Sequence, residues 1–197
     1  MHLNQIGLLG RYVILDFETT GLDPSVHSPI QIGLLIVEDG HILHSYERNI
    51  RNDNPVVSEY AMQVNNLTIN PPDALDHRAI QVQVRELIRR YFDEPVLLVG
   101  HNVPFDTSFL RVLFEGSTTP FHELFSHRSI DTSVLYQFHH RLGNLPKGGS
   151  LHQVAESLGI EVDQSVRHTA IGDCHLTLAV LNAFARRFNL HIPKGAV

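Results

Sequence analysis

The apolar residues of the first fifty positions occur in three short runs separated by turn-forming residues. Residues 12–17 predict a largely buried strand that ends at a Gly-Leu-Asp-Pro turn, and residues 30–37 and 42–50 predict two more strands. An Asp-Gly pair at positions 39 and 40 lies between the last two runs, a strong signal for a tight hairpin. The N-terminal quarter therefore predicts an antiparallel meander of three strands.

Apolar residues then recur at helical spacing, and these stretches alternate with short strand-like runs. The clearest stripe lies within residues 73–92, where the apolar side chains share one face of a helix. Strands are predicted at residues 96–100 and 128–132, and further helices at residues 58–64, 104–114, 151–158 and 168 or 169 to 188, with another that ends near residue 141. This order indicates an α/β fold with a mixed sheet of about five strands, three antiparallel and then parallel, flanked by helices.

Residues 142–150, Leu-Gly-Asn-Leu-Pro-Lys-Gly-Gly-Ser, form the loose segment of the pattern. This segment could link two domains, but too few residues follow it for a typical second domain. We therefore expect residues 1–197 to form a single domain, with residues 142–150 as a loop between two of its helices.

The composition is typical of a globular protein, with 43% hydrophobic and 18% charged residues. No stretch reaches the roughly 20 apolar residues that cross a bilayer, and the N-terminus lacks the pattern of a secretory signal. The single cysteine, Cys174, cannot form an internal disulfide, and we expect it to be a packed thiol. These features favour a cytoplasmic protein with no membrane partner.

Acidic residues stand at several ends of the predicted strands and helices. Asp16 and Glu18 close the first strand two positions apart, so both side chains project from one face of the sheet. Such neighbours repel each other unless a cation lies between them, although a solvated strand edge would also accommodate them. Asp106 suits the first turn of its helix with or without a further role. Asp173 interrupts an apolar helix, where a ligand and a solvated side chain are the two alternatives.

Three segments combine these residues into a known pattern. They are Asp-Phe-Glu-Thr-Thr-Gly at residues 16–21, His-Asn-Val-Pro-Phe-Asp at residues 101–106 and His-Thr-Ala-Ile-Gly-Asp at residues 168–173. Together they closely resemble the DnaQ-like, or DEDDh, family of 3′–5′ exonucleases, which includes polymerase proofreading subunits and RNA-trimming enzymes. The resemblance extends from about residue 12 to about residue 188, and it implies a ribonuclease H-like fold.

The resemblance also implies a role for each matching residue. The carboxylates that would hold two divalent cations, Mg²⁺ or Mn²⁺, are those of Asp16, Glu18, Asp106 and Asp173. These hard cations select oxygen ligands. His168 matches the general base that takes a proton from the attacking water. The residues that match substrate contacts are Thr19, Leu22, Phe105 and Asn65, although Asn65 and Asn66 stand where His and Gly are common in the family.

We therefore expect a phosphodiester hydrolase that releases 5′-mononucleotides from the 3′ end of single-stranded DNA or RNA by a two-metal-ion mechanism. The formal charge of −6 argues against a broad surface that coats a duplex, because such surfaces are normally basic. Two bound divalent cations would bring that charge to about −2, which suits a small site that holds a strand end.

Two other classes of protein, a non-catalytic binding module and a zinc hydrolase, share single features of this sequence. A non-catalytic module that binds nucleic acid or a polymerase on the same fold is the alternative, but such modules usually lack one or more acidic ligands. A zinc hydrolase is disfavoured because the 14 histidines show no ligand spacing. A DNA polymerase or a repair protein is a candidate partner, but the short segment after residue 188 favours a stand-alone trimming or repair enzyme. The preferred sugar and the oligomeric state stay open.

Overall fold

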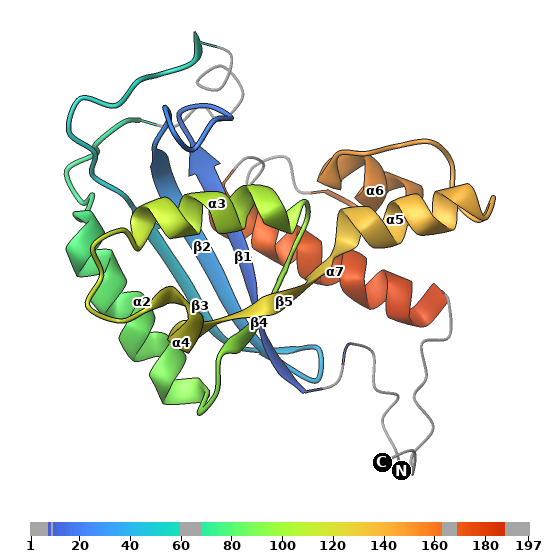
Figure 1. Cartoon of the computed structure of the whole chain (residues 1–197). Helices are drawn as coiled ribbons and strands as arrows, with labels where there is room; N and C mark the ends of the chain where they lie inside the picture. Colours follow the sequence, from blue (N-terminus) through green and yellow to red (C-terminus); the bar gives the residue numbers. More distant parts are fainter. Residues whose placement is uncertain (1–7, 9, 60–67, 163–168, 188–197) are drawn as a thin grey trace.

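The computed structural model describes residues 8, 10–59, 68–162 and 169–187. One sheet with strand order β3-β2-β1-β4-β5 carries helices on both faces (Figure 1). Its strands are β1 (Arg11–Thr19), β2 (Pro29–Glu38), β3 (His41–Asn49), β4 (Val96–Gly100) and β5 (Phe125–Asp131). The helices are α2 (His77–Tyr91), α3 (Val103–Leu113), α4 (Phe121–Leu124), α5 (Thr132–Arg141), α6 (Leu151–Ser157) and α7 (Ala170–Arg187). His168, Asn65 and most of the helix expected at residues 58–64 lie outside the described residues.

The first three strands form the predicted antiparallel meander. β1 pairs with β2, and β2 pairs with β3, in antiparallel registers. Asp39 and Gly40 connect β2 to β3 with φ angles of 49° and 82°, and the type I′ turn of a two-residue hairpin needs such positive values at both central positions. β4 then joins β1 in parallel, and β5 joins β4 in parallel. The predicted mixed sheet of five strands is confirmed.

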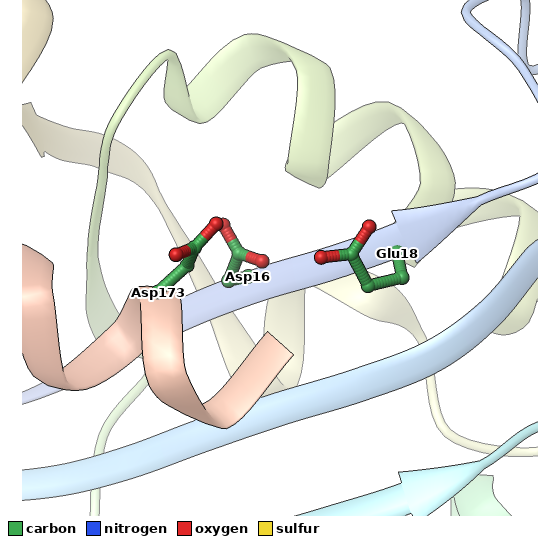
Figure 2. Close-up of side chains that lie close together, drawn as sticks. All are labelled: Asp16, Glu18 and Asp173. Atoms are coloured by element: carbon green, nitrogen blue, oxygen red, sulfur yellow. The ribbon is translucent and has the colours of Figure 1, made fainter. Parts of the chain in front are cut away.

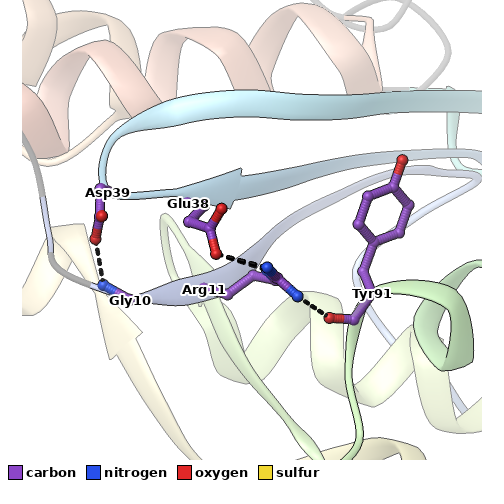
Figure 3. Close-up of polar contacts among 5 residues, drawn as sticks. All are labelled: Gly10, Arg11, Glu38, Asp39 and Tyr91. Atoms are coloured by element: carbon purple, nitrogen blue, oxygen red, sulfur yellow. Dashed lines mark hydrogen bonds and ion pairs between the residues drawn. The ribbon is translucent and has the colours of Figure 1, made fainter.

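Polar contacts fasten the start of β1 to its neighbours (Figure 3). The Arg11 guanidinium donates to the Glu38 carboxylate at 2.6 Å and to the backbone carbonyl of Tyr91, the last residue of α2. The backbone N–H of Gly10 donates to the Asp39 carboxylate at 2.7 Å. These contacts lie at the N-terminal end of β1, the opposite end from Asp16 and Glu18, so they hold the strand without occupying the end that carries those two carboxylates.

Alternation of side chains along β1 divides the core into two layers. Val13, Leu15 and Phe17 belong to a buried cluster with residues of α2 and α3, whereas Tyr12 and Ile14 pack with residues of α7. Figure 1 shows α7 on the face of the sheet away from α2 and α3. The side chains at positions 16 and 18 continue the second series, so they point towards the α7 layer.

Two element boundaries differ from the sequence prediction by several residues. β5 begins at Phe125 rather than at residue 128, because Phe125 already pairs with Val96 of β4 and is buried, and the short helix α4 precedes it. α2 begins at His77 rather than at residue 73, because the Asp76 carboxylate caps the helix by accepting from the Ala79 N–H at 2.8 Å. Neither difference moves a predicted site residue.

Candidate active site

Three carboxylates from two distant segments meet beside the C-terminal half of β1. Asp16 and Glu18 project from β1, and Asp173 projects from the first turn of α7 (Figure 2). One carboxylate oxygen from each residue lies within 4.8 Å of the other two. This spacing allows one cation to contact all three side chains, and the donor set consists of the oxygen atoms that Mg²⁺ and Mn²⁺ prefer.

Close packing between α7 and the sheet places Asp173. A Cβ atom at Gly33 of β2 would lie 2.5 Å from the backbone carbonyl of Ala170, so only a glycine allows the helix to approach this closely. The Gln31 side-chain oxygen accepts from the Ala170 N–H at 2.9 Å. The Glu47 carboxylate accepts from the Ile171 N–H at 3.4 Å. Polar groups of β2 and β3 therefore satisfy the backbone donors at the start of the helix.

Asp106 reaches the same end of β1 from α3, on the other layer. β4 ends at Gly100, opposite Leu15, so the edge of β1 beyond that point has no strand neighbour on this side. The Asp106 carboxylate takes that place and accepts from the Phe17 N–H at 3.0 Å. Asp106 is 3% exposed. It is not one of the three mutually close carboxylates, but its charge acts on Asp16 and Glu18.

Burial and mutual repulsion make these carboxylates reluctant to ionise. Burial raises the pKa of Asp16 well above its ordinary value, and the charges of Asp106, Asp173 and Glu18 add to the effect. Burial, followed by Asp173 and Asp106, raises the pKa of Glu18 to about 8. The pKa of Asp106 is also raised, chiefly by burial, although the hydrogen bond from Phe17 opposes the shift. A cluster that holds protons in this way is chemically suited to exchange them for cations.

Cys174 follows Asp173 in the chain, but its side chain belongs to the core. Its Sγ atom lies 3.3 Å from the Gly33 carbonyl oxygen and 3.8 Å from that of Ile14. Burial is the main cause that raises the pKa of the thiol, so it stays protonated near neutral pH. The packed thiol predicted from the sequence is confirmed.

The predicted substrate contacts within the described residues have different surroundings. Thr19 is buried, and its hydroxyl donates to the Gly21 carbonyl at 2.7 Å. Leu22 is 75% exposed on the loop that follows β1. Phe105 is partly buried, and its ring lies 5.0 Å from that of Phe109. The Leu22 side chain is thus exposed for contact with a ligand, whereas Thr19 and Phe105 are packed largely against the protein.

Two residues near the site did not emerge from the sequence. His152 on α6 places Nε2 4.0 Å from an Asp173 carboxylate oxygen, and no local pattern distinguishes it among the 14 histidines. Asp131 ends β5 and caps α5, and it also contacts the start of α3. Its place between a strand and a helix was a detectable sign of a cap, but not of the contact with α3.

None of the described helices is long and apolar enough to span a membrane.

Comparison with known proteins adds independent information about this arrangement. A model of the RNase_T family, described as exonuclease, matches residues 13–181. A PolC-type DNA polymerase III from Thermotoga petrophila is 30% identical over 174 residues, which cover 88% of this chain and 12% of that protein. A DNA polymerase III subunit epsilon-like protein from Rhodobacter capsulatus is 30% identical over 181 residues, which cover 89% of this chain and 23% of that protein. The chain thus spans less than a quarter of the length of these two relatives.

Solved structures share the same backbone arrangement. A zinc-bound form of Escherichia coli exonuclease I in complex with single-stranded DNA has a TM-score of 0.77 at 18% identity, over 90% of this chain and 41% of that chain. A product-bound exonuclease I has a TM-score of 0.75 at 16% identity, over 92% of this chain and 45% of that chain. The predicted ribonuclease H-like fold is confirmed by these similarities together with the five-stranded sheet.

Proposed function

Because this chain belongs to the RNase_T family of exonucleases, DnaQ-like enzymes of 3′–5′ polarity, we propose that it hydrolyses phosphodiester bonds one at a time from a 3′ end. The substrate is single-stranded DNA or RNA, and the products are 5′-mononucleotides. The observation that carries this proposal is the meeting of Asp16, Glu18 and Asp173 within 4.8 Å at the end of one strand. The whole chain, residues 1–197, acts as a single exonuclease domain.

Four carboxylates form the binding site for two divalent cations, Mg²⁺ or Mn²⁺. Asp16, Glu18 and Asp173 supply oxygen atoms from one side, and Asp106 supplies them from the α3 side. When bound, two such cations lower the pKa of an attacking water and stabilise negative charge on the leaving 3′ oxygen. The buried, mutually repelling carboxylates favour cation binding because the cations remove that repulsion.

The remaining residues of the proposed site accept the proton of the attacking water or contact the 3′ end of the nucleic-acid strand. His168, five residues before Asp173, accepts the proton of the attacking water. Thr19 follows Glu18 directly and Leu22 lies four positions after it, so the terminal nucleotide would lie against both, with the exposed Leu22 side chain on its base. Phe105, beside Asp106, and Asn65 contact the same end of the strand. A polymerase or a repair protein is a proposed partner, because the relatives include DNA polymerase III proteins.

A nuclease assay with strands of matched sequence tests the proposal. Single-stranded DNA and RNA carrying a 5′ label are incubated with the purified full chain and Mg²⁺, Mn²⁺ or EDTA. The expected result is a ladder that shortens from the 3′ end with either cation and disappears in EDTA. The same strands labelled at internal phosphates should release labelled 5′-mononucleotides. The relative rates on the two strands identify the preferred sugar.

Two variants separate this activity from a contaminating nuclease. Asp16→Ala removes a proposed ligand and should abolish shortening. Asp93→Ala removes an exposed carboxylate from the turn between α2 and β4, and it should leave the rate unchanged. If the wild-type chain shortens neither strand with either cation, the enzyme proposal fails, and a module that binds nucleic acid without cutting it takes its place.

A further inference from the structure

The Asp131 carboxylate, at the end of β5, connects the starts of two helices. Its Oδ1 atom accepts from the Ser133 N–H at 2.8 Å and from the Ser133 hydroxyl at 2.6 Å, which caps α5. The same oxygen accepts from the Asn102 N–H at 3.0 Å, and Oδ2 accepts from the Val103 N–H at 3.0 Å. One side chain thus caps α5 and also accepts hydrogen bonds from two backbone N–H groups at the start of α3.

α3 depends on this external contact because it has no cap of its own. Its N-cap residue, Asn102, makes no side-chain capping hydrogen bond and adopts a left-handed backbone with φ of 69°. Pro104 at the second helical position has no N–H to donate. The backbone N–H groups of Asn102 and Val103 would otherwise lack a partner at the helix start, so Asp131 does for α3 what a capping side chain usually does.

The position of α3 in turn sets the position of Asp106. Asp106 lies in the first turn of the helix, four positions after Asn102. Its carboxylate accepts from the Phe17 N–H between Asp16 and Glu18 on β1. A small shift of the helix start would therefore move Asp106 relative to both β1 ligands.

We propose that Asp131 is a positioning residue for the cation site. Through its hydrogen bonds to the start of α3, Asp131 holds the Asp106 carboxylate in position beside Asp16 and Glu18 of β1. The proposal rests on the exonuclease function proposed above, because it assigns Asp131 to the support of that metal site. We do not assign Asp131 as a ligand, because its two oxygens together accept four hydrogen bonds from the protein and it is not one of the mutually close carboxylates among the described residues. Partners that orient the ligands of a metal commonly change its affinity by about 10- to 100-fold when they are removed.

Thr132 strengthens the same connection. Its hydroxyl donates to the Gly100 carbonyl at 3.0 Å, and its Oγ1 atom lies 3.0 Å from His101 Nδ1. Asp131 and Thr132 together therefore contact each of the four residues that lead from β4 into α3. A change at Asp131 alone removes the contacts nearest to the helix and leaves the Thr132 contacts in place.

Two substitutions at position 131 separate the α3 contact from the α5 cap. Asp131→Ser keeps a good cap for α5, because a serine hydroxyl can accept from the Ser133 N–H, but it is too short to serve α3 as well. Asp131→Asn keeps one oxygen and places an amide NH₂ group where Val103 needs an acceptor. The main readout is the dissociation constant for Mn²⁺, measured by titration calorimetry on the full chain without substrate. The second readout is the Mn²⁺ concentration that gives half-maximal exonuclease rate.

Asp76→Ser serves as the matched control. Asp76 caps α2 by accepting from the Ala79 N–H at 2.8 Å, and α2 carries none of the proposed site residues. We expect Asp131→Ser and Asp131→Asn to weaken Mn²⁺ binding by about tenfold, with a rate at saturating Mn²⁺ within about threefold of wild type. Asp76→Ser should bind Mn²⁺ as the wild type does, even where its thermal midpoint falls.

Each possible result of these measurements either supports or overturns the proposal for Asp131. Mn²⁺ binding by Asp131→Ser within twofold of wild type would overturn it, and so would an equal loss of affinity in Asp76→Ser, because the effect would then reflect stability alone. A wild-type chain that binds Mn²⁺ but shortens no strand would refute the exonuclease function, while the calorimetric comparison at position 131 would still stand. A wild-type chain that binds no Mn²⁺ would overturn the Asp131 proposal as well.

Discussion

Gly33 of β2 lies directly against the first turn of α7, where a Cβ atom would come within 2.5 Å of the carbonyl carbon and oxygen of Ala170. The contact lies three residues before Asp173, so the absence of one side chain on the sheet determines where a carboxylate of the site can stand. The helix cannot be moved outward without separating Asp173 from Asp16 and Glu18.

Gly33→Ala should therefore damage the site as well as the packing. Overpacking of this kind costs about 1–3 kcal/mol, which lowers the thermal midpoint of a chain of this size by roughly 2–12 °C. Because the displaced helix carries Asp173, Mn²⁺ affinity should also fall by at least about tenfold. Calorimetric titration with Mn²⁺ and thermal unfolding in EDTA measure the two effects. Gly149→Ala, where a Cβ meets nothing within 4 Å, should change neither.

His168→Ala should remove turnover while the metal site stays intact. A general base contributes typically about 10²–10⁴-fold to the rate, so the single-turnover rate at saturating Mn²⁺ should fall by that order. Mn²⁺ affinity and binding of a single-stranded oligonucleotide should stay within about twofold of wild type. His122→Ala, an exposed histidine on α4, is the control. A His168→Ala variant with a near wild-type rate would remove His168 from the mechanism.

The stability of the metal-free chain should fall as the pH rises above neutrality. Burial and the charges of Asp173 and Asp106 raise the pKa of Glu18 from 4.5 to about 8, so the folded state binds more protons than the unfolded state between these values. The stabilising contribution of the Glu18 proton is complete below pH 4.5 and is lost as the pH rises through about 8. Asp16 and Asp106, whose pKa values are also raised, act in the same direction.

Thermal unfolding between pH 5 and pH 9 measures this dependence. The midpoint in EDTA should decline above about pH 7, because below that pH the lowered pKa values of the partly buried His77 and His101 oppose the effect of the carboxylates. Saturating Mg²⁺ or Mn²⁺ should raise the midpoint most at the alkaline end, because a ligand of the folded state alone stabilises it. Glu18→Gln cannot ionise and should flatten the decline in EDTA. A midpoint that rises with pH above neutrality in the wild-type chain would contradict the assigned direction.

Leu22→Ala should affect the substrate without affecting the fold. The side chain is 75% exposed, so its removal should change the free energy of unfolding by less than about 0.5 kcal/mol. Loss of its proposed contact with the terminal base should raise KM about fivefold, which corresponds to roughly 1 kcal/mol of apolar contact. Steady-state kinetics on a single-stranded oligonucleotide measure the change. Leu43→Ala, on β3 and 41% exposed, should leave KM unaltered, and equal effects from both variants would argue against a specific contact.

Local patterns in the sequence were sufficient to predict much of the sheet. The Asp39-Gly40 pair predicted the hairpin between β2 and β3, because only certain residues adopt two successive positive φ angles. The two-residue spacing of Asp16 and Glu18 predicted that both carboxylates leave the same face of β1. The order of strand and helix patterns likewise predicted an antiparallel meander followed by parallel strands, and the observed sheet has that form.

Local patterns failed where an element is defined by a distant partner. The start of β5 could not be predicted, because Phe125 becomes part of the strand through its pairing with Val96 of β4. The role of Asp131 was hidden for a similar reason. Its local context shows a cap for α5, whereas its contacts with Asn102 and Val103 bridge 29 and 28 residues of the chain.

The sequence by itself determined which chemical groups this protein possesses and which face of each element carries them, because side-chain periodicity is a local property of strands and helices. Tertiary structure alone decided that Asp173 stands within 4.8 Å of Asp16 and Glu18, and that Asp106 binds the Phe17 N–H across 89 residues of chain. Those distances depend on how closely α7 and α3 approach the sheet. That approach is set by the missing side chain of Gly33 and by the hydrogen bonds of Asp131, which act between segments that no local pattern connects.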